Sequence, residues 1–198
     1  MSIEAKQQIE SSARKRNSDA TKDAIVTAAR IEFQRAGYEG ASTRRIASDA
    51  GCNVALINRY FGSKIGLFET VMEACIDLSP LAGLTQDQMV SALVDIALAK
   101  TGSQGDFDPV VVAIKSSGSA AAQEVVRDKL GNPMVEELAS LIGGDYAKQK
   151  AGVVLSIISG MFVGRVSIRA DALASDESEV IRPMLTDALN AVLATGRD

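Results

Sequence analysis

The pattern of apolar positions along this chain predicts helices throughout. In most segments apolar residues recur every three or four positions, as they do on one face of an amphipathic helix. The final segment shows this clearly, with apolar residues at Val180, Ile181, Met184, Leu185, Ala188, Leu189 and Val192. No alternation of apolar and polar residues persists over the length of a strand. We therefore expect an all-α protein.

Near the start of the chain, two short helical patterns are separated by a glycine. Ser42 is a suitable N-cap for a helix over Thr43–Ala50, because its hydroxyl can accept a hydrogen bond from the first turn. Gly51 follows, where a left-handed residue ends many helices. Asn53 then caps a second helix over Val54–Phe61. Helix, glycine turn and helix form the helix-turn-helix pattern, whose second helix enters the DNA major groove in known examples.

The segments on either side of this pattern complete a small domain. A longer helix is expected to begin at Ser18 or Asp19 and to end at Gly37, and it would support the helix-turn-helix pair. Residues 1–17 are polar and lack apolar periodicity, so we expect a flexible arm there. The arm contains Arg14-Lys15-Arg16. It either lies on DNA, as basic arms of other proteins do, or is a solvated tail.

Charge is distributed unevenly along the chain. Residues 1–64 contain 11 Lys and Arg against 7 Asp and Glu, whereas residues 65–198 contain 10 against 18. The net charges are therefore +4 and −8, which add up to the −4 of the whole chain. A basic first part suits a protein that contacts DNA with one end only.

Composition argues against an enzyme or a metal protein. The chain has no histidine, which is the commonest general base and a common zinc ligand. Cys52 and Cys75 form no C-x-x-C pair and are expected to be small buried apolar residues. The polar N-terminus shows no secretory signal. We therefore expect a cytoplasmic protein without catalytic residues, cofactor or metal.

A group of small residues is prominent in the later part of the chain. No charged residue occurs between Ala151 and Gly164, and we judge this run too short for a membrane span of about 20 residues. Within it, glycine or serine recurs every four residues, at Gly152, Ser156, Gly160 and Gly164. Such a stripe lets another helix approach closely.

Several residues of the helix-turn-helix segment match a family pattern. They are Thr43, Ile46–Ala47, Ala50–Gly51, Ile57, Tyr60–Phe61–Gly62–Ser63–Lys64 and Leu67. In these positions the chain resembles the TetR/AcrR family of bacterial transcriptional regulators. Cys52, Asn58 and Ile65 depart from the usual valine, tyrosine and acidic residue. The resemblance implies an N-terminal three-helix DNA-binding domain over residues 18–64, followed by a helical ligand-binding and dimerisation domain over residues 65–198.

Two helices supply the expected DNA contacts. Arg44 and Arg45 add charge to a helix N-terminus, which itself favours a phosphate. On the outer side of the next helix, asparagine, arginine and small apolar groups suit adenine, guanine and the thymine methyl. These outer residues are Asn53, Val54, Ala55, Asn58 and Arg59. The resemblance adds Thr43 as a backbone or base contact, and Tyr60 and Lys64 as phosphate contacts.

The resemblance also implies a homodimer whose last two long helices form the interface. The expected interface residues are Gly152, Ser156, Gly160, Gly164, Ile181, Leu185 and Leu189. The implied function is that of a repressor that binds a palindromic DNA operator and is released by a small molecule. The scarcity of aromatic residues favours an apolar or amphipathic ligand. The candidate pocket residues are Phe68, Met72, Met89, Phe107, Val111 and Met134.

Two alternatives remain open at this stage. Some family members activate transcription, so a ligand-responsive activator has the same sequence features. A helical αα-hairpin also occurs as a plain packing unit, so the second alternative is a helical protein-interaction module that never binds DNA. Binding to DNA next to its own gene would distinguish this module from a regulator.

Overall fold

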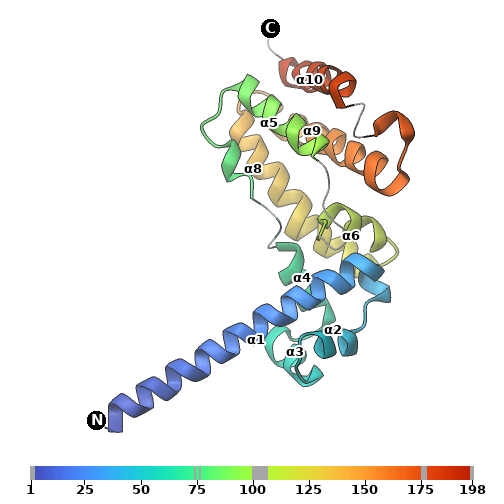
Figure 1. Ribbon diagram of the computed structural model, residues 1–198. Coiled ribbons are helices and arrows are strands. Elements are labelled where there is room, and N and C mark those ends of the chain that lie inside the picture. Colours follow the sequence, from blue (N-terminus) through green and yellow to red (C-terminus); the bar gives the residue numbers. More distant parts are fainter. Residues whose placement is uncertain (1–2, 74, 76, 100–106, 175–177, 197–198) are drawn as a thin grey trace. The chain divides into compact units, whose positions relative to one another are not determined.

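The computed structural model describes residues 3–73, 75, 77–99, 107–174 and 178–196, with side chains from Asn17 onward (Figure 1). Every regular element in these ranges is helical, which confirms the predicted all-α class. The chain forms two compact units. Unit 1 comprises residues 1–74 and 112–125, and unit 2 comprises residues 75–111 and 126–198. This division differs from the predicted domain boundary at Lys64, because unit 1 also takes in a segment from the middle of the chain.

Unit 1 consists of four helices from the start of the chain and a later segment. The helices are α1 (Ile3–Gly40), α2 (Thr43–Asp49), α3 (Val54–Phe61) and α4 (Lys64–Glu73), joined by the end of α6 (Pro109–Lys115) and by α7 (Ala120–Val126). Short loops join α1 to α4 in sequence. The predicted helix-turn-helix pair is therefore α2 and α3.

The start of α1 was predicted wrongly. The helix begins at Ile3, not at Ser18 or Asp19. Because residues before Asn17 lack apolar periodicity, a helix there has no apolar face for packing. These residues can still form a helix, since helical propensity does not depend on such a face. Residues 3–16 contain no glycine or proline and are rich in alanine, glutamine, glutamate, lysine and arginine, which are good helix formers. The side chains of Arg14-Lys15-Arg16 lie outside the described residues, so their contact with DNA stays a prediction.

The core of unit 1 is built around three aromatic rings. Phe33 packs edge to face against Phe68 of α4, with 5.0 Å between ring centroids, and Tyr38 lies 5.2 Å from the same ring. Such contacts add to the free energy gained by burying the rings. The apolar side chains around them come from all four helices: Ile25, Ala28, Ala29, Ile46, Ala47, Ile57, Leu67, Val71 and Met72.

A polar junction fastens the later segment to the end of α1. Lys115 Nζ donates hydrogen bonds to the carbonyl oxygens of Gln34 at 2.7 Å and Arg35 at 3.4 Å. The backbone N–H of Tyr38 donates to the buried Ser116 Oγ at 2.9 Å. Between them lies Gly37, with a φ of 65°, where an added Cβ would lie 2.5 Å from the Lys115 carbonyl oxygen. Only glycine fits this position, because both its backbone conformation and its surroundings exclude a side chain.

Unit 2 is a layered bundle whose longest helices pack against one another. Its helices are α5 (Gln86–Leu98), α8 (Asn132–Ile142), α9 (Ala147–Phe162) and α10 (Ser178–Ala194). Shorter elements are the 3-10 helices η1 (Ser79–Leu81) and η4 (Asp171–Leu173) and the π-helical segments η2 (Arg127–Gly131) and η3 (Val163–Ile168). α9 contacts α5, α8 and α10, so it is the central helix of the bundle. The core is aliphatic and includes Val90, Leu93, Val94, Leu138, Val154, Leu189 and Leu193.

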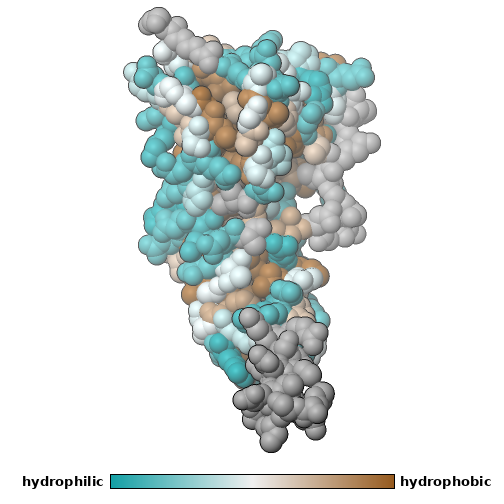
Figure 2. All heavy atoms as spheres, turned by 90° about the vertical axis from the view of Figure 1, so that its left-hand side faces the viewer, coloured by the Kyte–Doolittle hydropathy of each residue, from teal (hydrophilic) through white to brown (hydrophobic). Residues whose placement is uncertain are grey.

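Despite its central position, α9 leaves much apolar surface uncovered. The helical stretch Ala147–Ile168 has 22 residues and a mean hydropathy of 1.8, yet only 17% of its apolar window is buried. By length and composition this stretch could cross a membrane, because the helix continues beyond the uncharged run Ala151–Gly164 at both ends. Figure 2 shows that apolar side chains also lie among polar ones on the surface turned to the viewer. Much of the apolar surface of this helix is therefore not buried within the single chain.

Candidate nucleic-acid interface

Side-chain caps fix where α2 and α3 begin. Ser42 Oγ accepts a hydrogen bond from the backbone N–H of Arg45 at 3.4 Å, and Asn53 Oδ1 accepts one from Ala55 at 2.8 Å. Between the helices Gly51 has a φ of 65°, and the Cys52 N–H donates to the Ala47 carbonyl at 2.9 Å. These are local interactions, which is why both caps and both helix starts could be predicted from sequence.

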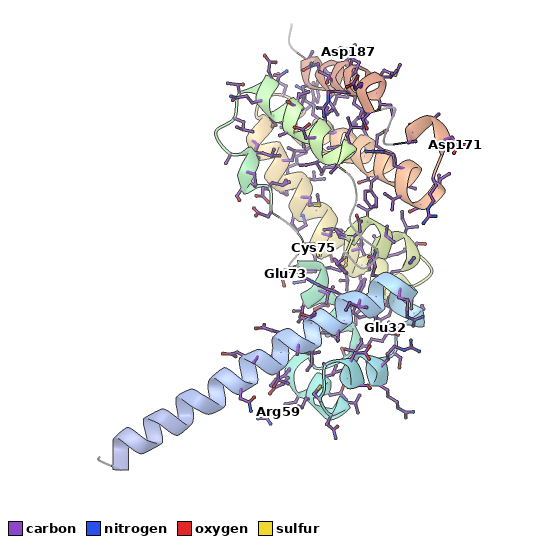
Figure 3. All side chains as sticks on the ribbon, viewed as in Figure 1. Glu32, Arg59, Glu73, Cys75, Asp171 and Asp187 are labelled. Atoms are coloured by element: carbon purple, nitrogen blue, oxygen red, sulfur yellow. The ribbon has the colours of Figure 1, made fainter. Side chains whose placement is uncertain are left out.

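The two faces of α3 differ as predicted. Ile57 is fully buried and Leu56 and Phe61 are half-buried, so this side packs against the rest of unit 1. The five residues predicted to contact bases are all exposed. They are Asn53, Val54, Ala55, Asn58 and Arg59, the last of which is labelled in Figure 3. This face offers amide, guanidinium and small apolar groups, which together can distinguish base pairs in a major groove.

The first turn of α2 presents positive charge. Arg44 and Arg45 are exposed, and Thr43 is half-buried at the first position of the helix. The free N–H groups of this turn and the positive end of the helix dipole favour an anion in the same place. This end of α2 can therefore hold a phosphate while α3 contacts bases.

Tyr60 and Lys64 are engaged with α1. Tyr60 OH accepts a hydrogen bond from Ser18 Oγ at 3.3 Å, and Lys22 Nζ lies 5.4 Å from the tyrosine ring centroid. Lys64 Nζ donates to the Glu39 carbonyl at 3.2 Å and lies 4.7 Å from the ring centroid of Tyr38. Each residue thus ties its helix to α1. Their contact with phosphates, implied by the family resemblance, stays a prediction.

Sequence reasoning missed Glu32, which joins α1 to the start of α2. Its side chain is only 2% exposed and accepts two hydrogen bonds from Arg35, each of 2.9 Å, and one from the backbone N–H of Ser42 at 3.0 Å. The hydrogen bonds from Arg35 are the main reason why the pKa of Glu32 lies below its usual value. Glu32 follows Ala29 and Ala28 by three and four residues, so its carboxylate lies on the apolar face of the helix. This spacing was the sequence signal that could have identified Glu32.

Part of the predicted dimer interface is buried within the single chain. Ile181, Leu185 and Leu189 are buried in the core of unit 2, at 7%, 7% and 1% exposure, because this face of α10 covers α5 and α9. Gly164 is also covered within the chain, since an added Cβ there would lie 2.6 Å from Leu173 Cδ1. These four residues are occupied inside one subunit.

The remaining stripe residues are open. Ser156 and Gly160 are exposed and Gly152 is half-buried. An added Cβ at either glycine would have no atom within 4 Å. On α10, the large apolar side chains that are exposed are those of Val180 and Met184, at 56% and 64% exposure. The uncovered part of the small-residue stripe therefore lies at the surface of the bundle, whereas Leu185 and Leu189 of α10 lie in its core.

The predicted ligand-lining residues are distributed over the two units. Those in the first unit and two of the four in the second are buried apolar side chains, as the core of either unit requires. In detail, Phe68, Met72, Met89 and Val111 are buried, and Phe107 and Met134 are half-buried. Their contact with a ligand stays a prediction.

Comparison with known proteins identifies the family. Residues 25–71 match the family model described as "Bacterial regulatory proteins, tetR family", and residues 87–193 match the model "Tetracyclin repressor-like, C-terminal domain". The HTH-type transcriptional regulator BetI of Vibrio campbellii is 25% identical over 174 residues, which are 81% of this chain and 87% of the relative. An HTH-type transcriptional repressor of Streptomyces coelicolor is 47% identical over 58 residues, which are 29% of this chain and 30% of the relative.

A solved structure shows the same fold at low identity. NalD, the secondary repressor of the MexAB-OprM multidrug efflux pump in Pseudomonas aeruginosa, has a TM-score of 0.65 at 14% identity over 88% of this chain and 97% of that chain. The second family model spans more than half of the sequence, and the first spans the helix-turn-helix with its supporting helix. The chain therefore belongs to the TetR family of bacterial transcriptional regulators.

Proposed function

We propose that this regulator is a homodimeric repressor that binds a palindromic DNA operator and leaves it when a small apolar or amphipathic molecule binds the body of the protein. The observation that carries the proposal is the exposed outer face of α3 next to the basic first turn of α2. Its activity is binding alone, with no enzymatic step, and DNA as its target places it in the cytoplasm.

On the DNA, α3 enters the major groove and α2 lies at its edge. Asn53, Asn58 and Arg59 contact base edges, where a good bidentate pair contributes about 1–3 kcal/mol of discrimination. Arg44 and Arg45 neutralise phosphates, and these contacts set the register without specifying sequence. The more acidic composition of residues 65–198 disfavours DNA elsewhere on the chain.

The homodimer follows from surface that one chain leaves uncovered. α9 is strongly apolar yet mostly unburied, and the open positions Gly152, Ser156 and Gly160 permit close approach of another helix. Membership of a family of DNA-binding regulators favours a second copy over a lipid bilayer as the partner of this face. A two-fold dimer then places two α3 helices in successive major grooves, about 34–36 Å apart.

Release by a ligand is a shift in population. A molecule that binds more tightly to a form with the wrong spacing of α3 helices draws the dimer away from its operator. The aliphatic character of the chain, with only 4% aromatic residues, suits an apolar or amphipathic molecule. A thermal-shift screen should therefore select such molecules, and a screen in which only hydrophilic compounds raise the melting temperature would contradict this part.

The decisive experiment is selection of bound DNA from a random pool at physiological ionic strength. Ionic strength must be fixed because phosphate contacts make the affinity depend strongly on salt. We expect a palindrome with half-sites about one helical turn apart. Selected DNA with a single half-site would contradict the dimeric mode, and no enrichment at all would contradict the operator. A reporter gene behind the selected palindrome separates a repressor from an activator.

A further inference from the structure

Glu32 is unusual because it is a charged side chain on the buried face of α1. The apolar positions Ile25, Ala28, Ala29 and Phe33 form this face, and Glu32 shares it with an exposure of 2%. A buried carboxylate is costly unless all its oxygens have partners. The partners of Glu32 therefore show what the carboxylate does.

Both carboxylate oxygens are fully used. Oε2 accepts a hydrogen bond from Arg35 Nε, and Oε1 accepts one from Arg35 Nη2, both at 2.9 Å. Oε1 also accepts the backbone N–H of Ser42 at 3.0 Å, and it lies 3.9 Å from Arg45 Nε. One oxygen thus connects a helix of the scaffold to the first residues of the helix-turn-helix.

The contact with Ser42 acts on the exact place where α2 begins. Ser42 is the N-cap, and its hydroxyl accepts the N–H of Arg45. A carboxylate that holds the backbone of the cap residue holds the first turn of α2 with it. The side chain of Arg45 is 57% exposed, so its guanidinium keeps donors for an external anion while Nε lies near Glu32.

We propose that Glu32 is a positioning residue for DNA binding: it holds the first turn of α2 and the Arg45 guanidinium in the geometry that meets a phosphate, without touching DNA itself. The proposal rests on the proposed function, in which Arg45 contacts a phosphate. A negative charge beside a DNA-binding surface would by itself weaken binding, so the benefit of Glu32 comes entirely from geometry.

Electrostatics and geometry therefore predict opposite effects on DNA affinity when the charge of Glu32 is removed, and this can be tested in the full-length protein. Glu32→Gln keeps the size of the side chain and removes its charge, and Glu39→Gln is the matched control. Glu39 is an exposed carboxylate at the end of the same helix, and it contacts Lys64 through its backbone carbonyl only. Both substitutions raise the net charge by the same amount, so general electrostatics predicts equal or tighter binding to DNA for both.

Affinity for the selected operator is measured by fluorescence anisotropy well below the melting temperature of each variant. We expect E39Q to bind as tightly as wild type or tighter, and E32Q to bind about five- to tenfold more weakly, a loss typical of one charge-assisted contact. In an Arg45→Ala background the loss from E32Q should shrink, because part of it acts through Arg45. Glu32→Asp, which keeps the charge, should restore part of the affinity.

The outcomes separate this proposal from the function on which it rests. If E32Q binds the operator as tightly as E39Q, the positioning role is wrong. A lower melting temperature of E32Q together with unchanged binding would show that Glu32 contributes to stability alone. If the losses of operator affinity caused by E32Q and R45A add in full in the double variant, the proposed coupling between Glu32 and Arg45 is also wrong. If the wild-type protein binds no DNA from the pool, the proposed function itself fails.

Discussion

The proposed dimer face on α9 allows a prediction in which the isolated subunit and the dimer respond in opposite directions. Within one chain, Gly160 faces open space, since an added Cβ would have no atom within 4 Å. Its backbone is that of an ordinary residue within α9. A side chain at this position therefore meets nothing unless another molecule lies there.

Helix propensity sets the expectation for the isolated subunit. Glycine inside a helix costs roughly 0.5–1 kcal/mol relative to alanine, so Gly160→Ala should raise the free energy of unfolding of a monomer by about that amount. In a dimer whose helices meet at the stripe, added carbon atoms have no room. Overpacking costs about 1–3 kcal/mol per site, and two-fold symmetry applies it twice.

The net effect on dimerisation is therefore unfavourable by roughly 2–6 kcal/mol for Gly160→Leu. Since 1.4 kcal/mol corresponds to a factor of ten, the dissociation constant of the dimer should rise by a factor of about 30 or more. Sedimentation equilibrium over a range of protein concentrations measures this constant directly. Circular dichroism of the same samples shows whether each subunit keeps its helices.

Gly118→Leu is the matched control. Gly118 lies outside α9 in the turn before α7, its φ is not positive, and an added Cβ there would also have no atom within 4 Å. It should leave the dissociation constant unchanged. A G160L protein that is more stable and as strongly dimeric as wild type would refute the assignment of the stripe to the interface. A wild-type protein that is monomeric at every concentration would refute the homodimer.

Three further predictions concern unit 1. Arg59→Ala should lose roughly 1–3 kcal/mol of operator binding and relax base choice at one position, whereas Lys64→Ala should weaken binding to all sequences alike, as measured on operator and random DNA. Lys115→Met should lower the free energy of unfolding by about 0.5–1 kcal/mol, because the ammonium bonds carbonyls at the end of the helical part of α1; urea unfolding tests this. The lowered pKa of Glu32 predicts that its stabilising effect is complete above the pKa of an unfolded glutamate, about 4.3, and is lost as pH falls through the lower folded value. Urea titrations of wild type and Glu32→Gln at several pH values should therefore converge in acid.

Each of these three has a distinct contrary result. Equal losses on operator and random DNA for both R59A and K64A would remove the division between base and phosphate contacts. For Lys115, the control is Lys148→Met, which removes an exposed lysine paired with Glu136 in the other unit. Equal decreases in the free energy of unfolding for the two variants would show that the hydrogen bonds of Lys115 to α1 stabilise the protein no more than a surface ion pair does. Curves for wild type and E32Q that stay parallel into acid would show that Glu32 is not ionised more readily when folded.

Features set by neighbouring residues could be predicted from sequence, and those set by distant ones could not. The caps at Ser42 and Asn53 and the turn at Gly51 each depend on residues within a few positions, so the helix-turn-helix was predicted with its boundaries. The contact between Glu32 and Ser42 joins two helices, and the spacing of Glu32 on α1 indicates a buried carboxylate but not its partner. The same holds for Lys115, whose carbonyl partners lie about eighty positions earlier in the chain.

The burial of the predicted interface residues of α10 within one chain has a specific physical reason. Helical periodicity shows that a face must be covered, but it does not say whether the covering helix belongs to the same chain or to another. α10 carries apolar residues on two sides: Leu185 and Leu189 cover α9 and α5, and Met184 faces outward. Small residues are more informative, because a glycine is costly in a helix and is kept where a neighbour comes close. At Gly164 that neighbour is Leu173 of the same chain. At Gly152 and Gly160 no atom of the described residues lies within 4 Å of an added Cβ, and this is why the proposed interface is best tested there.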